Sequence, residues 1–252
     1  NPKINKILNF SRKKISYNFL KKIKLPNKIK NTKNIKNLQL KEYVNKKPKI
    51  VHIITGLVRG GAERALYTLL TNGFQKHTQN SVISLMSEGY YGPLLKKNKI
   101  QLNCLNMDRG KINIPSIYKL RKVLIKENPD IIQGWMYHGN LAAFLGKYMI
   151  KKKVILSWNV RLSLEIFSEM KFTTKIAVRM GALLSKKCYS IIYNSTRSLL
   201  QHRSIGFSNN NDFYIPNGFD VKRWKPKINI RNKLRNSFGI PKHTKVIGYV
   251  GR

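Results

Sequence analysis

Short apolar runs alternate with amphipathic stretches from Lys49 onward. The runs are rich in Ile and Val, which is typical of parallel strands that are buried on both faces. The predicted strands cover residues 50–54, 81–86, 100–105, 131–135, 154–158, 189–193 and 213–215. Apolar residues at helical spacing predict helices over 62–74, 92–99, 114–127, 140–150, 165–185 and 195–204. This alternation predicts an α/β fold with a doubly wound, Rossmann-like parallel sheet.

The pattern is different at the two ends of the chain. Residues 1–48 form a basic N-terminal segment, with an amphipathic helical pattern followed by a Lys- and Asn-rich linker. The predicted domain then covers 49–220. Residues 221–252 read as an interdomain segment with a helix at about 231–238 and a last apolar strand at 246–250. We interpret that strand as the first strand of a second α/β domain that the sequence truncates.

The large positive net charge of the chain favours partners that carry negative charge. Lys and Arg number 50 and Asp and Glu 10, for a net charge of +40, although 42% of the residues are apolar. Such an excess favours nucleic acid or an anionic membrane surface as the partner. The basic amphipathic segment favours lipid, whereas a compositional bias of the coding sequence explains the lysines equally well. Two cysteines exclude a disulfide scaffold and multi-cysteine zinc motifs.

Ligands of doubly wound sheets bind beyond the carboxyl ends of the strands, so the residues after each predicted strand are the candidates. Gly60 and Gly61 follow the first strand, where paired glycines let backbone N–H groups approach an anion at a helix N-terminus. The alternative is a tight turn with left-handed backbone angles. Neither the GxGxxG spacing of dinucleotide-binding proteins nor a Walker A motif is present, which argues against an oxidoreductase.

Three further candidates follow later strands. His138, after the fourth strand, has the chemistry to hydrogen-bond a sugar hydroxyl or to transfer a proton, or it caps the next helix. Arg161, after the fifth strand, can pair with phosphate or carboxylate, or it is one surface arginine among many. Asn194 follows the sixth strand and lines the same edge, unless it caps the helix that follows. The scattered acids and histidines predict no metal site.

These loops form an ordered series of motifs: GLVRGGAER, WMYHGN, WNVR, IIYNS, YIPNGFD and VIGYVGR. Over residues 49–252 the series resembles the N-terminal half of glycosyltransferase family 4, whose members are retaining enzymes of GT-B fold. The resemblance implies two Rossmann-like domains that face each other across a cleft. The N-terminal domain would hold the acceptor, and the C-terminal domain would hold a nucleotide-sugar donor.

The resemblance also assigns roles to residues. Gly60 and Gly61 match the glycine loop near the donor phosphates and the acceptor, and His138 matches the histidine that contacts the transferred sugar. Arg161 is carried over to the same crevice. Asn217 and Gly218 match the interdomain I-P-N-G segment, and Arg252 matches the arginine that binds the donor diphosphate. The family's diphosphate-binding lysine and E-x7-E motif would lie beyond Arg252 and are not in the sequence.

We therefore expect a fragment of a retaining hexosyltransferase that uses a nucleotide-sugar donor and a lipid-linked or glycan acceptor in surface polysaccharide or glycolipid synthesis. The resemblance implies no metal and no cofactor, and a peripheral location at the cytoplasmic face of an anionic membrane. The chain alone is expected to be inactive, because most donor contacts would be missing. The alternative is a basic nucleic-acid-binding protein, although no helix-turn-helix, RRM or zinc pattern supports it.

Overall fold

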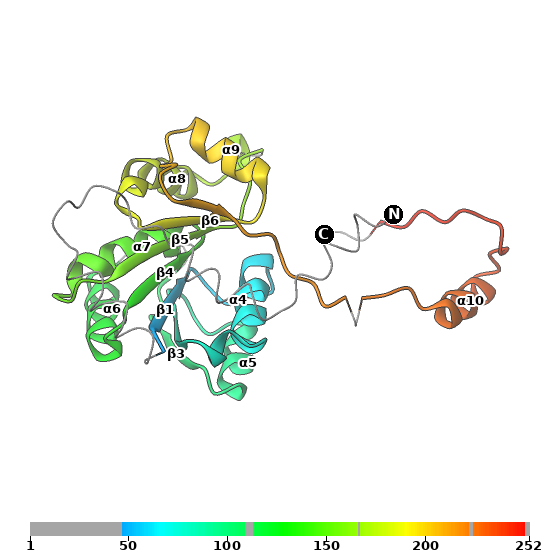
Figure 1. Cartoon of the computed structure of the whole chain (residues 1–252), viewed down its shortest axis with the longest axis horizontal. Helices are drawn as coiled ribbons and strands as arrows, with labels where there is room; N and C mark the ends of the chain where they lie inside the picture. The colour runs from blue at the N-terminus through cyan, green and yellow to red at the C-terminus, as the bar shows by residue number, and fades with distance from the viewer. Residues whose placement is uncertain (1–46, 109–112, 166, 222–223, 250–252) are drawn as a thin grey trace, which may run out of the picture. The chain divides into compact units, whose positions relative to one another are not determined.

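The computed structural model describes residues 47–108, 113–165, 167–221 and 224–249 (Figure 1). The chain divides into two compact units, Asn1–Pro216 and Asn217–Arg252. The amphipathic pattern predicted within residues 1–48 lies almost wholly outside the described residues, as does Arg252. Both therefore remain predictions.

The first unit is built on one parallel sheet. Its seven strands are β1 (Lys49–Ile54), β2 (Gln79–Ser84), β3 (Gln101–Cys104), β4 (Ile131–Trp135), β5 (Ile155–Val160), β6 (Ser190–Tyr193) and β7 (Asp212–Tyr214). They lie in the order β3-β2-β1-β4-β5-β6-β7, and every neighbouring pair is parallel. The predicted doubly wound, Rossmann-like sheet is confirmed. The strand order reverses between β1 and β4, and ligands of such sheets bind beside this switch point.

Helices cover both faces of the sheet, as right-handed crossovers require. The helices are α4 (Gly61–Thr71), α5 (Tyr91–Lys97), α6 (Ile114–Glu127), α7 (Met136–Met149), α8 (Phe172–Leu184) and α9 (Thr196–Ser204). Short 3-10 turns lie at η1 (Phe74–Lys76), η2 (Phe167–Glu169) and η3 (Ser185–Lys187). Ser195 caps α9, because its Oγ accepts a hydrogen bond from the backbone N–H of Ser198 at 3.0 Å.

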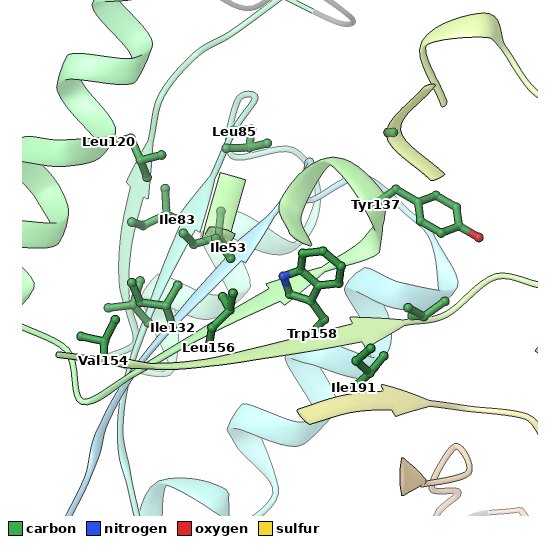
Figure 2. Packing of buried hydrophobic residues seen from close by; sticks show 14 of the residues in the cluster. Ile53, Ile83, Leu85, Leu120, Ile132, Tyr137, Val154, Leu156, Trp158 and Ile191 are labelled. Atoms are coloured by element: carbon green, nitrogen blue, oxygen red, sulfur yellow. The ribbon is translucent and has the colours of Figure 1, made fainter. Parts of the chain in front are cut away.

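Alternate residues along the central strands enter two separate cores. Ile54 of β1 packs with residues of α4 and α5 on one face, and Ile53 packs with residues of α6, α7 and α8 on the other. Figure 2 shows Ile53, Ile132 and Leu156, from three adjacent strands, on the same side of the sheet. Burying each such side chain contributes about 1.5–3 kcal/mol. This double burial explains why the strands read as continuous apolar runs rather than as alternating ones.

Several sequence-based boundaries need correction. The helix predicted over residues 165–185 begins only at Phe172, after the 3-10 turn η2. Helix α7 begins at Met136, not at residue 140, so His138 lies in its first turn rather than in a loop. Strand β5 extends to Val160, so Asn159 belongs to the strand. Residues 246–249, the described part of the strand predicted at 246–250, are not in a strand, and no strand among the described residues pairs with them. In the second unit the described helix is α10 (Ile228–Ser237).

Candidate functional site

The carboxyl ends of the central strands lie at one level of the sheet. Ile54 of β1 pairs with Trp135 of β4, and Trp135 pairs with Asn159 of β5. One residue further along, Val160 pairs with Tyr193 of β6. The segments that carry Gly60, His138, Arg161 and Asn194 therefore leave the sheet along the same edge. The first two flank the switch point between β1 and β4, where a ligand is expected.

The glycine pair is not explained by backbone strain. Gly60 is the N-cap residue of α4 with an extended backbone (φ −145°), and neither glycine has a positive φ. The left-handed turn considered from the sequence is therefore wrong. A Cβ at Gly61 would meet no atom within 4 Å, whereas a Cβ at Gly60 would lie 2.2 Å from a carboxylate oxygen of Glu63. The missing side chain at Gly61 thus leaves open space beside the N-terminus of α4, which a ligand can approach.

Backbone hydrogen bonds hold this glycine loop against the loop after β2. Leu85 N–H donates to Ile54 O at 2.9 Å, and Tyr91 N–H donates to Leu57 O at 2.8 Å. Gly89 has φ +50°, and a Cβ there would lie 2.6 Å from the Leu57 carbonyl. Only glycine combines this angle with such close backbone contact. Gly89 therefore fixes the loop before Gly60, a role that the sequence pattern did not reveal.

His138 is brought to the switch point by two close backbone approaches. A Cβ at Gly139 would lie 2.6 Å from the Ile53 carbonyl oxygen, and a Cβ at Gly134 would lie 2.5 Å from the Asn140 Cα. The first turn of α7 therefore packs directly on the ends of β1 and β4. The strand turns into the helix at Met136, whose φ of +63° is strained for a residue with a side chain.

The chemistry of His138 follows from its half-buried position. Burial lowers the pKa of His138 below its ordinary value of 6.5, so the ring is neutral at pH 7. A neutral imidazole offers one donor nitrogen and one acceptor nitrogen. The N-cap residue of α7 is Trp135, so the alternative role of His138 as the helix cap is wrong.

Arg161 reaches from the end of β5 over the end of β4. Its guanidinium lies 5.5 Å from the centre of the Trp135 ring, and its Nη1 donates to Asn159 Oδ1 at 3.4 Å. The Trp135 indole in turn donates to Nδ1 of the fully buried His52 at 3.2 Å. Burial lowers the pKa of Arg161, yet guanidinium remains charged at neutral pH. Arg161 is thus a partly buried cation above β4, not an unconstrained surface residue.

The remaining predicted site residues are placed differently. Asn194 follows β6 at the same edge and is half-buried, and Ser195, not Asn194, caps the next helix. Asn217 and Gly218 are exposed and begin the second unit. A Cβ at Gly218 would meet no atom within 4 Å.

A buried hydrogen-bond network anchors the first turn of α7 from behind. The carbonyl oxygen of Ser198 can only accept, so His202 Nδ1 carries the proton and donates to it at 2.7 Å. His202 Nε2 then accepts from the Tyr137 hydroxyl at 2.9 Å. The sequence alone contains no sign that His202 has this role. A histidine on a helix carries no signal that its partner is a tyrosine 65 residues earlier.

The described residues contain no group of three or more His, Cys, Asp or Glu side chains placed to hold a metal ion. Among the same residues, no helix is long and apolar enough to cross a bilayer. The groups that this edge does present are a helix N-terminus, a neutral imidazole and a guanidinium, which offer hydrogen bonds and positive charge.

No protein-family model and no curated protein matches the sequence. Solved structures do match, among them HepE of Anabaena in complex with UDP and glucose, at a TM-score of 0.61 and 18% identity over 76% of this chain and 50% of that chain. Sucrose-phosphate synthase of Thermosynechococcus elongatus matches at 0.56 and 9% identity, over 75% and 52%. The lipopolysaccharide outer core galactosyltransferase WaaB matches at 0.53 and 15% identity, over 71% and 50%.

The chain thus spans about half the length of the structures that it matches. At these identities the likeness establishes the fold alone, and the family 4 assignment within that fold remains an expectation. The parallel sheet, its strand order and these matches together show that the chain has the Rossmann-like fold of the N-terminal half of GT-B glycosyltransferases.

Proposed function

We propose that this chain is the acceptor-binding half of a glycosyltransferase that uses a nucleotide-sugar donor. The observation behind the proposal is that the segments carrying Gly61 and His138 flank the switch point between β1 and β4, while Arg161 reaches from the end of β5 over Trp135 of β4. The fold is shared with HepE, which was crystallised with UDP and glucose, and with the galactosyltransferase WaaB. Fold alone does not assign an activity, so the proposal depends on these side chains.

Each residue has a role that follows from its surroundings. The open space at Gly61 admits a ligand to the N–H groups at the start of α4, which favour negative charge. The neutral ring of His138 donates to or accepts from a sugar hydroxyl. Arg161 supplies positive charge, and charge that develops on a departing diphosphate is stabilised by such preorganised groups.

The finer features of the proposal come from the resemblance to family 4. We propose transfer of a hexosyl group with retention of the anomeric configuration, with neither a metal nor a cofactor. Asn194 lines the acceptor side, Asn217 and Gly218 serve the interdomain segment, and Arg252 binds the donor diphosphate. The acceptor is a lipid-linked sugar or a glycan of surface polysaccharide or glycolipid synthesis.

The charge of +40 supports a location at the cytoplasmic face of an anionic membrane, where such acceptors are embedded. Salt is expected to release the chain from anionic vesicles. Nucleic acid is the other polyanion that this charge would attract. Filter binding with RNA and DNA, run beside vesicle flotation at the same salt concentration, distinguishes the two. Tighter binding to RNA or DNA than to vesicles would favour the nucleic-acid function.

The proposal is tested by replacing His138. Most donor contacts lie in the other half, so this chain should bind UDP-glucose only weakly. We expect His138→Ala to weaken that residual binding about three- to tenfold, since one hydrogen bond contributes about 0.5–1.5 kcal/mol. The measurement is a calorimetric or NMR titration of the full chain. His77→Ala is the matched control, because His77 is exposed and lies at the far end of the α4–β2 connection. Equal affinities of the two variants would contradict the assignment of His138.

A further inference from the structure

Helix α8 has a second apolar face that points away from the core. Phe172, Ile176, Met180 and Leu183 are 76%, 41%, 45% and 77% exposed. Their spacing along the helix places them in one continuous row. The opposite face carries Ala177, Val178, Gly181 and Ala182, which are buried in the core. We call the exposed row the α8 stripe.

A continuous row of this kind is unusual on a surface, where single exposed apolar residues are common. Helix α6 provides the contrast within the same layer. It also exposes Ile114, Tyr118 and Ile125, and its Arg121 has the same helical position as Arg179 in α8, but Lys122 stands where α8 has Met180. The outward face of α8 is therefore the more apolar of the two, with four large apolar side chains and one arginine against three apolar and two basic side chains on α6.

Basic side chains border the α8 stripe, and α8 itself contains no acid. Arg179 is exposed along one side of the row. Lys175 lies on the same side and is half-buried, and its Nζ donates to the Ser168 carbonyl at 2.6 Å. Lys186 and Lys187 follow the C-terminal end of the helix and are exposed. An apolar row beside positive charge is the pattern of helices that lie in the interface of an anionic bilayer.

The net charge argues against a second copy as the occupant of this face. Each copy brings a charge of +40, so that two copies repel one another wherever their basic borders approach. An anionic bilayer offers the reverse: phosphates for the basic border and acyl chains for the apolar row.

We propose that the α8 stripe docks this chain on anionic lipid. The helix lies in the plane of the interface, with Phe172 and Leu183 inserted at the boundary of headgroups and acyl chains and Arg179 beside the phosphates. Helix α8 runs antiparallel to the strands and so begins near the carboxyl edge of the sheet. The inference rests on the proposed function, because docking there brings the candidate site close to a lipid-linked acceptor.

The test compares two double variants of the full chain on vesicles of phosphatidylglycerol and phosphatidylcholine. We expect Phe172→Gln/Leu183→Gln to weaken binding in flotation assays at least about tenfold, since two large apolar side chains no longer enter the bilayer. Tyr118→Gln/Ile125→Gln on α6 is the matched control and is expected to change binding less than about twofold. Circular dichroism verifies that both variants are folded, as substitutions at exposed positions allow.

A charge variant tests the basic border separately. We expect Arg179→Gln to weaken binding about fivefold on phosphatidylglycerol vesicles, because one basic residue near an anionic surface contributes about that factor. On pure phosphatidylcholine its binding should equal that of the unaltered chain. An equal loss on both lipids would contradict the electrostatic part of the proposal.

Three results would overturn the proposal. Unchanged binding by the α8 variant would assign lipid contact to another surface, such as the basic segment within residues 1–48. Equal losses in the α6 and α8 variants would indicate diffuse attraction. If the chain self-associates and the α8 substitutions make it monomeric, the stripe is a contact with a second copy of the chain. The proposed function is tested independently, because His138→Ala should still bind vesicles and the α8 variant should still bind UDP-glucose.

Discussion

At the scale of single residues, burial determines the protonation of the histidines in the first unit. His52 and His202 are fully buried, His138 is half-buried, and the pKa of each is lowered by burial. His52 accepts from the Trp135 indole at Nδ1, so its Nε2 donates to Asn80 Oδ1 at 3.1 Å. The neutral ring is therefore the form that the fold requires.

This requirement predicts a loss of stability in acid. The pKa of His52 falls from 6.5 to about 4 on folding, so between these values the unfolded chain binds a proton that the folded chain does not. The free energy of unfolding then decreases as the pH falls from 6.5 toward 4, by up to about 3 kcal/mol, and is unaffected by His52 above pH 6.5. Urea unfolding at pH 7.5, 6.0 and 4.5 measures the change.

The control for this prediction separates His52 from the other titrating groups. His52→Gln should unfold with a shallower dependence on pH than the unaltered chain, whatever its stability at pH 7.5. An unchanged slope in His52→Gln would show that another group is responsible.

Sequence reasoning found the site residues that stand directly after strands, because their position along the chain is itself the signal. Gly60, His138 and Arg161 were identified in this way, although their roles in binding remain predictions. Gly89 and His202 were missed, since each acts through a partner that is distant in the sequence: the Leu57 carbonyl and the Tyr137 hydroxyl. Such contacts exist only once the chain is folded.

At the scale of elements, close packing of α7 on the sheet places the candidate site. Apolar periodicity predicted both the strands and the helix, but it located the start of α7 four residues too late. The polar His138 and the Gly139 that follows it conceal the helical pattern there. The early start of the helix depends on Gly134 and Gly139, which let the backbones approach.

A pair of glycine substitutions tests this packing. Gly139→Ala places a methyl group 2.6 Å from the Ile53 carbonyl, so α7 must shift away from β1. We expect a loss of about 1–3 kcal/mol in the free energy of unfolding, measured in urea. Gly61→Ala is the control, because its methyl group enters open space and should change stability by less than about 0.5 kcal/mol. Equal stability of the two variants would contradict the close approach.

At the scale of the whole molecule, the sequence predicted the doubly wound parallel sheet correctly, because strands that are buried on both faces are continuous apolar runs in the sequence. Residues 246–249 are as apolar as a strand but are not in one, and they have no pairing partner among the described residues. The prediction that they belong to a second α/β domain is untested. A strand is stable only within a sheet. The net charge is the other property of the whole chain. The basic residues beside the α8 stripe place part of that charge at the proposed contact with lipid.

The central claim is that ligands bind at the switch point, where the strand order reverses between β1 and β4. Mapping a ligand onto the folded chain tests this claim most directly. The isotope-labelled chain would be titrated with UDP-glucose while backbone amide resonances are followed by NMR. We predict shifts at Gly60, Gly61, His138 and Arg161, and none at the opposite ends of the strands, such as Lys49 and Ser190. Because most donor contacts lie in the other half, binding is expected to be weak, and the position of the shifts is the readout. Shifts confined to those opposite ends would contradict the account.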